Sequence, residues 1–298
     1  MLLRQNLSLY RILKITWRID LLMVALCTAA YFTDTILLPK LQIPPALPTL
    51  LGTALAFFIA FNSNQAYSRW WEARIIWGAL VNDSRSFARS LQAYVSEEDR
   101  TVTTRMIRRH IGFLYALKAA LRKNITTGHL TAYLPAEEAQ WLSHFKNIPS
   151  AILDLQAQDL QLLSNRQQIE GFRFQALNGL LKDFTDSMGK SERINNTVYP
   201  TTYVYFTKLF IWILVILITM AISESVGPAA IFLGWMIGFV FHTTHINGMS
   251  LMNPFEESPA CVPLNSITRT IEINLLQMLG DKEIPPPEPA VNHNEYIL

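Results

Sequence analysis

Residues 47–74 read LPTLLGTALAFFIAFNSNQAYSRWWEAR, and this stretch determines the class of protein that the sequence encodes. Its first 22 residues belong to a run of 28 residues, Leu41–Ser68, that carries no charged side chain, and the run ends at Arg69. A helix needs about 20 mostly apolar residues to cross the hydrocarbon core of a bilayer. The stretch therefore predicts a membrane-spanning helix that reaches a polar boundary near Arg69.

Other segments of the 298-residue chain are also nearly free of charge. The whole chain is 50% hydrophobic and only 16% charged, whereas soluble domains carry about 25% charged residues. We therefore predict an all-α membrane protein with four transmembrane helices and a helical cytosolic domain. The predicted spans are 18–38, 46–67, 205–223 and 228–250.

Lys and Arg are distributed unevenly around these spans. Seventeen of the 25 basic residues lie between Arg69 and Arg193, and none lies between the last two spans. Because basic loops stay in the cytoplasm, this distribution predicts an even number of crossings with both termini cytoplasmic. The net charge of +2 argues against a nucleic-acid binder that is held by bulk electrostatics.

The same charge pattern divides the chain into segments. Within the predicted cytosolic domain, 102–123 shows apolar residues at helical spacing opposite a basic face. We expect that face, which consists of Arg105, Arg108, Arg109 and Arg122, to lie in solvent or against lipid headgroups. The predicted segments are an interfacial N-terminal helix (1–17), spans 1 and 2 (18–67), the cytosolic helical domain (68–204), spans 3 and 4 (205–250), and a cytosolic C-terminal segment with an extended tail (251–298).

One face of the second span carries the candidate functional residues. Thr53, Phe57 and Phe61 recur at steps of four, over about 12 Å of helix. The same face continues inward as Asn64 and Ser68, which are polar. An apolar face that becomes polar is typical of a helix lining a pore, if several copies surround an axis. The alternative is that the two phenylalanines are ordinary packing residues.

Side chains for enzymatic chemistry are missing from the sequence pattern. No glycine-rich phosphate loop or hydrolase motif is present. His242 and His245 share a helix face in the fourth span, but no acid or cysteine accompanies them in that segment. We therefore predict neither enzyme activity, nor a cofactor, nor a bound metal, and we expect the two histidines to hydrogen-bond to helices or water.

Three motifs resemble the bestrophin family of ion channels, in its bacterial branch. They are RWWEARIIWGAL from Arg69, SERINNTVYPTTYVY from Ser191 and LMNPFEE from Leu251. Their order along the chain, between pairs of spans, also resembles the family. The residues that carry the resemblance are Arg69, Trp70, Trp71, Glu72, Arg74, Glu192, Arg193, Pro200, Asn253, Pro254 and Phe255.

The resemblance implies a homopentamer in the bacterial inner membrane, with lipid and monovalent ions as its other partners. It implies one axial pore lined by the second span, with a hydrophobic neck at Thr53, Phe57 and Phe61. Thr53 departs from the family, in which an apolar residue is expected. A second, cytosolic constriction is implied near Tyr199. Chloride is the favoured ion by the same resemblance.

Calcium binding, which animal members perform after the NPF turn, is not expected here. Glu256 and Glu257 are followed by Ser-Pro-Ala-Cys and not by an acidic run, whereas Ca²⁺ takes six to eight oxygen ligands. Two carboxylates are better suited to a structural role. The alternatives to an anion channel are a cation-selective channel of the same fold, a secondary transporter and a non-conducting membrane scaffold.

Overall fold

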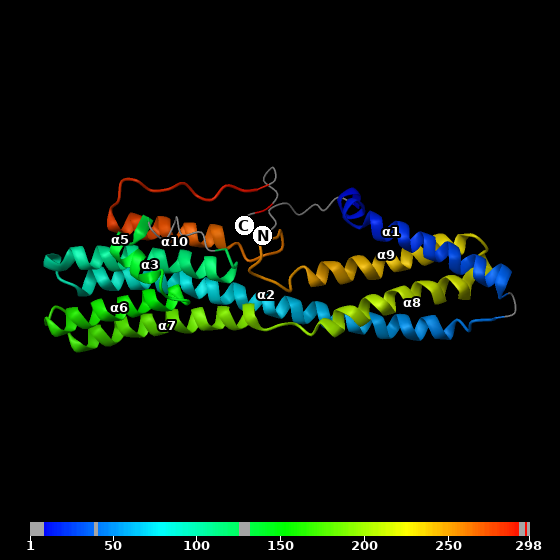
Figure 1. Cartoon of the computed structure of the whole chain (residues 1–298), viewed down its shortest axis with the longest axis horizontal. Coiled ribbons are helices and arrows are strands. Elements are labelled where there is room, and N and C mark those ends of the chain that lie inside the picture. The colour runs from blue at the N-terminus through cyan, green and yellow to red at the C-terminus, as the bar shows by residue number, and fades with distance from the viewer. Residues whose placement is uncertain (1–8, 39–40, 125–131, 292–295, 297–298) are drawn as a thin grey trace. The chain divides into compact units, whose positions relative to one another are not determined.

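The computed structural model describes residues 9–38, 41–124, 132–291 and 296. Regular structure in this part of the chain is helical, apart from one isolated bridge between Val291 and Tyr296 (Figure 1). A π-helical turn, Thr33–Leu37, extends the first helix, and a 3₁₀ turn, Glu97–Asp99, precedes α3. The α-helices are α1 (Leu9–Phe32), α2 (Ala46–Tyr94), α3 (Arg100–Leu121), α5 (Ala136–Leu142), α6 (Ile148–Asn165), α7 (Gly171–Asn196), α8 (Thr201–Val226), α9 (Ala229–Met249) and α10 (Leu264–Leu279).

The described helices include four that are long and apolar enough to cross a membrane, as the sequence predicts. They are Ile12–Leu37, Ala46–Tyr94, Thr201–Val226 and Ala229–Met249. Their bounds differ from the prediction at two places. α2 continues for 49 residues to Tyr94, and α1 runs unbroken from Leu9, so the described part of the expected interfacial helix is continuous with the first span.

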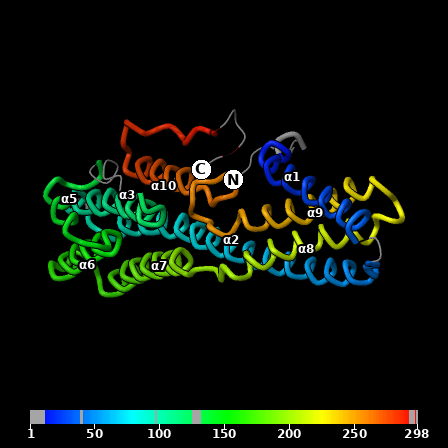
Figure 2. The backbone as a smooth tube through the Cα atoms, turned by 45° about the vertical axis from the view of Figure 1, so that its right-hand side comes forward, coloured from blue at the N-terminus to red at the C-terminus, as the bar shows by residue number. Residues whose placement is uncertain are grey.

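The chain divides into two compact units. The membrane unit consists of Arg4–Arg69 and Val198–Met252, and the helical unit consists of Trp70–Thr197 and Asn253–Leu298. The C-terminal segment, which the sequence assigns to a part of its own, therefore belongs to the helical unit. There α10 packs against α3 (Figure 2), and the described residues after Asp281 form no helix.

Close helix packing in the membrane unit depends on two glycines of α9. Gly234 and Gly238 are four residues apart and face neighbouring helices so closely that an added Cβ atom would overlap them. Small residues at this spacing allow helix backbones to approach in a membrane. The side chains that each Cβ would meet are Thr219 and Cys27 at Gly234, and Met23 and Val215 at Gly238.

The core of the helical unit contains a histidine among aromatic rings. His110 is fully buried, and its ring centroid lies 4.2 Å from that of Phe184 and 5.4 Å from that of Phe87. Its Nε2 atom lies 2.8 Å from the hydroxyl of Ser84. Burial lowers the pKa of His110 to about 3, so the ring is neutral at physiological pH.

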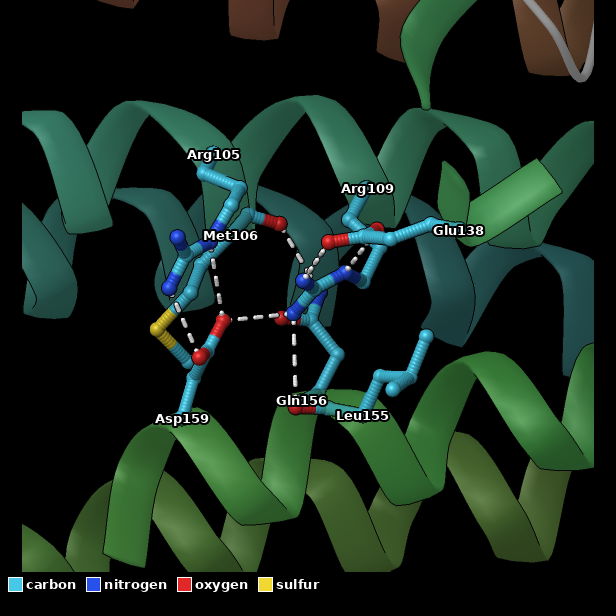
Figure 3. Close-up of polar contacts among 7 residues, drawn as sticks. All are labelled: Arg105, Met106, Arg109, Glu138, Leu155, Gln156 and Asp159. Atoms are coloured by element: carbon cyan, nitrogen blue, oxygen red, sulfur yellow. Dashed lines mark hydrogen bonds and ion pairs between the residues drawn. The ribbon is translucent and has the colours of Figure 1, made fainter. Parts of the chain in front are cut away.

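The basic face of α3 is the clearest error of the sequence prediction. Arg109 is 3% exposed and lies between α3, α5 and α6 (Figure 3). Its guanidinium donates to the carboxylate of Glu138 at 2.5 Å and to that of Asp159 at 2.6 Å. Burial opposes the charge, but the two carboxylates outweigh it and raise the pKa of Arg109. Arginine 109 is therefore part of the core.

The other arginines of that face are also paired in the described structure. Arg105 shares Asp159 at 2.8 Å, and Arg108 pairs with Asp281 at 3.1 Å while remaining half-exposed. Arg122 is nearly buried and pairs with Glu257 at 2.6 Å. Arg108 therefore lies in solvent as predicted, and Arg105 does so in part. Arg109 and Arg122 do not, because their carboxylate partners come from segments far along the chain, which helical periodicity alone does not reveal.

Candidate functional site

Within the membrane unit, α2 has a buried face and an exposed face. The buried face consists of Leu55, Ile59, Asn62 and Ala66, none of which is more than 3% exposed. Their spacing of four, three and four residues keeps them on one side of the helix. They pack with the apolar core that α1 and α8 contribute around Met23 and Leu214.

The opposite face carries the residues that the sequence predicted to line a pore. Phe57 is 73% exposed and Phe61 is 56% exposed, although both are large apolar side chains. Thr53, Asn64 and Ser68 are exposed on the same side. The structure thus brings together all of the predicted pore-lining residues on a surface that no other described residue of this chain covers, and their role remains a prediction.

Thr53 is less polar in this setting than its residue type indicates. Its hydroxyl donates to the backbone carbonyl of Thr49 one turn earlier, at 2.9 Å. A hydroxyl bonded in this way has its donor satisfied by its own helix. The side chain can therefore present its methyl group beside Phe57, which reduces the departure from an apolar residue.

A shallow apolar cavity of about 640 Å³ adjoins the exposed face. Small residues of α2, Gly52, Ala56 and Ala60, create the space, and Leu214 of α8 and Phe241 of α9 line its other side. Thr53 and Phe57 lie at the boundary between this cavity and the exposed face. In this chain the cavity is open, so its apolar lining is left for lipid or another protein surface.

The rotation of α2 about its axis is set by a buried amide. Asn62 accepts a hydrogen bond from the hydroxyl of Tyr199 at 2.6 Å and donates to the hydroxyl of Thr207 at 3.2 Å. These bonds join α2 to α8 and to the segment that precedes α8. They fix α2 in the rotation at which the neighbouring Phe61 points away from the core. Sequence reasoning placed Tyr199 at a constriction and missed this contact; the constriction remains a prediction.

The first two motifs meet in the helical unit. Glu72 forms an ion pair with Arg193, between α2 and α7. Glu192, the neighbour of Arg193, accepts a hydrogen bond from Asn147 at 3.0 Å. Both contacts are solvent-exposed, so their contribution to stability is small. Their effect is to align the start of the second motif with the first.

The third motif is a structural turn. Asn253 donates to Glu256 at 2.8 Å, and the carbonyl of Pro254 accepts from the amide of Val262 at 2.8 Å. Phe255 is buried, and its carbonyl accepts from Arg122 at 3.2 Å. Because Glu256 and Glu257 are engaged by Asn253 and Arg122 respectively, both carboxylates serve this turn. Among the described residues, no group of three or more acidic, His or Cys side chains could hold a metal ion.

Comparison with known proteins assigns the chain to a family. A family model described as bacterial/fungal bestrophin protein matches residues 8–277. The chain belongs to the bestrophin family. The matched range includes the four candidate spans and all three bestrophin motifs.

Two relatives and one solved structure show how similar known proteins are to this chain. The voltage-dependent anion channel-forming protein YneE of Salmonella typhi is 29% identical over 237 residues, which are 80% of this chain and 77% of the relative. A protein of the same description from Nostoc sp., alr2987, is 26% identical over 258 residues, 84% of each chain. The crystal structure of a bacterial bestrophin homologue from Klebsiella pneumoniae has a TM-score of 0.84 at 25% identity, and the match covers 90% of this chain and all of that one.

Proposed function

We propose that this bestrophin is an anion-conducting channel of the bacterial cytoplasmic membrane, assembled as a homopentamer with both termini in the cytoplasm. The names of its relatives support anion conduction. The observation that carries the proposal is the exposure of Phe57 and Phe61 on a helix whose opposite face is buried. Large apolar side chains exposed in this way need a partner or a function.

In the proposed channel, α2 from each protomer lines one axial pore. Phe57 and Phe61 form rings that make a narrow apolar neck, with Thr53 above it. Apolar constrictions stop conduction by losing their water, and they conduct when the lining helices move. Asn64 and Ser68 follow the neck and rehydrate the ion on the cytosolic side.

Selectivity in such a neck depends on how the phenyl rings are turned. The edge of an aromatic ring carries partial positive charge and its face partial negative charge. Rings that point edge-on into the pore favour chloride, and rings that lie face-on favour monovalent cations. We propose the edge-on arrangement, because the relatives are named as anion channels.

The apolar cavity beside Thr53 fits the proposed assembly. A neighbouring protomer that packs against Gly52 and Ala56 would cover it and leave Phe57 directed at the axis. Assembly would then remove from lipid a surface that one chain leaves open.

The test is a reversal-potential measurement on protein reconstituted in planar bilayers. Under a tenfold KCl gradient, a perfectly selective channel reverses at about 59 mV, with opposite signs for anions and cations. Phe57→Ala should raise the conductance, because it widens the neck. Phe58→Ala is the matched control, because Phe58 is also exposed but points about 100° away around the helix.

Each result of this measurement decides between the functions considered. Reversal at the chloride potential supports the proposal, and reversal at the potassium potential establishes the cation channel instead. Saturating flux that Phe57→Ala does not change indicates a transporter. No flux from the wild type or from Phe57→Ala would leave a membrane scaffold.

A further inference from the structure

Ionisable and polar side chains are buried together inside the membrane unit, away from the proposed neck. Asp20 of α1 is 8% exposed, His242 of α9 is 6% exposed and His245 is 1% exposed. Thr16, one turn before Asp20, is buried as well. Ionisable residues within membrane segments are rare and commonly belong to ion or proton pathways.

The helix register shows why these groups meet. Gly234 of α9 faces Cys27 of α1, and Gly238 faces Met23, so the two helices run antiparallel. One further turn along α9 is His242, which this register places against Asp20. The next residue on that face is His245, which falls at the level of Thr16.

The third helix that packs at this site, α8, contributes a positively charged residue, Lys208. Gly234 and Gly238 also face Thr219 and Val215 of α8, and the same step leads along α8 toward Lys208. Lys208 interacts electrostatically with both histidines, and Asp20 interacts with His242. The charged groups facing the pair are thus Asp20 from α1 and Lys208 from α8, while residues 41–68, which include the membrane part of α2, carry none.

Several polar atoms of this group have no hydrogen-bond partner among the described residues. They are Oδ1 of Asp20 and Nε2 of both His242 and His245. The other carboxylate oxygen of Asp20 accepts from the hydroxyl of Thr16 at 2.6 Å. A buried polar atom without a partner costs about 1–3 kcal/mol, and a bound proton would turn an imidazole nitrogen into a donor for the free carboxylate oxygen.

The same helices hold the pore-lining helix in place. Thr207, the neighbour of Lys208, is the hydroxyl to which Asn62 of α2 donates. Gly248 of α9 packs against Ser63 of α2 so closely that a Cβ would overlap it. A shift of α8 or α9 would therefore change the contacts of Asn62 and Ser63, which lie beside Phe61 on α2.

We propose that Asp20, His242 and His245 form a proton-binding site, and that protonation of this site weakens the contacts of α8 and α9 with α2. The added proton draws α9 toward Asp20, and the new positive charge repels Lys208 on α8. Because α8 moves, the hydrogen bond from Asn62 to Thr207 weakens and α2 can rotate. Ion flux therefore rises as the pH falls. The effect on flux rests on the proposed channel function, whereas proton binding does not.

Flux through reconstituted protein, recorded with equal pH on both sides, tests the coupling. Between about pH 8 and about pH 4, a range wide enough for buried imidazoles to take up protons, wild-type flux should rise by about fivefold or more. The double variant H242Q/H245Q keeps polar side chains but binds no proton, and it should lose this response. His144→Gln is the control, because His144 is exposed in the helical unit, and it should respond as the wild type does. An unchanged response in the double variant overturns the proposal.

A second measurement is independent of conduction. Protein with isotope-labelled histidine in detergent micelles should show imidazole resonances that titrate over the same pH range and disappear in H242Q/H245Q. Asp20→Asn should move that titration to lower pH, because it removes the nearby negative charge. If the resonances of His242 and His245 do not titrate, the site does not exist. If they titrate but no protein version conducts at any pH, the channel function fails and the proton site stands.

Discussion

The buried arginine of α3 gives the sharpest quantitative prediction, the effect of Arg109→Met on the stability of the helical unit. The guanidinium is 3% exposed and bonds two carboxylates and the carbonyl of Leu155. Breaking a buried ion pair by removing one partner costs about 3–5 kcal/mol. Asp159 keeps its bond to Arg105, and Glu138 is 20% exposed and can reach water. The free energy of unfolding should therefore fall by about 3 kcal/mol, the lower end of this range.

The matched control is Arg105→Met, which removes a partner of the same carboxylate. The Arg105 side chain is 40% exposed, and ion pairs of that kind contribute about 0.2–1 kcal/mol. Thermal unfolding of the two variants in detergent compares them directly. For a unit of this size each kcal/mol lowers Tm by about 2–4 °C, so Arg109→Met should lose on the order of 10 °C and Arg105→Met at most about 4 °C. Equal losses would refute the assignment of Arg109 to the core.

Three more variants test other parts of the structure. Burial lowers the pKa of His110 to about 3, so between that value and the ordinary pKa of about 6.5 only the unfolded chain takes up this proton. This histidine alone should lower stability by about 1.4 kcal/mol per pH unit as the pH falls through that range, and in chemical unfolding curves His110→Phe should reduce the slope by that amount. Asn62→Ala removes the hydrogen bonds to Tyr199 and Thr207 and should raise flux at neutral pH, whereas the flux of the control variant Phe58→Ala should equal that of the wild type. Gly238→Val would overlap Met23 and Val215 and should abolish folded protein in size-exclusion profiles, whereas Gly189→Ala, with nothing near its Cβ position, should not.

The sequence predicted those features that depend on one helix alone and on its apolar surroundings. The absence of charge from Leu41 to Ser68 results from contact with lipid and neighbouring apolar helices, so all four candidate spans could be found, although the sequence did not show that α2 continues to Tyr94. That Phe57 and Phe61 share one face of α2 followed from their four-residue spacing, because that spacing depends only on helix geometry; that this face is exposed is shown by the structure. Neither inference needed knowledge of a distant segment.

Sequence reasoning failed where the outcome depends on which segments meet. Arg109 and Arg108 are adjacent on α3, yet Arg109 is buried and Arg108 is half-exposed. The difference comes from Glu138 and Asp159, whose position beside Arg109 no periodicity predicts. A usable signal was overlooked at Gly234 and Gly238, since glycines four residues apart in an apolar segment indicate close helix contact.

The orientation of α2 follows from a polar contact more than from its apolar residues. Leu55 and Ile59 bury one face of α2, but apolar packing in a membrane tolerates rotation, because lipid tails are as apolar as the helices. Asn62 does not tolerate rotation in the same way, since turning it outward leaves an amide in hydrocarbon without a partner. Its bonds to Tyr199 and Thr207 therefore select the rotation at which Phe57 and Phe61 are exposed. In the proposed channel, a residue that does not face the pore thus determines which residues do.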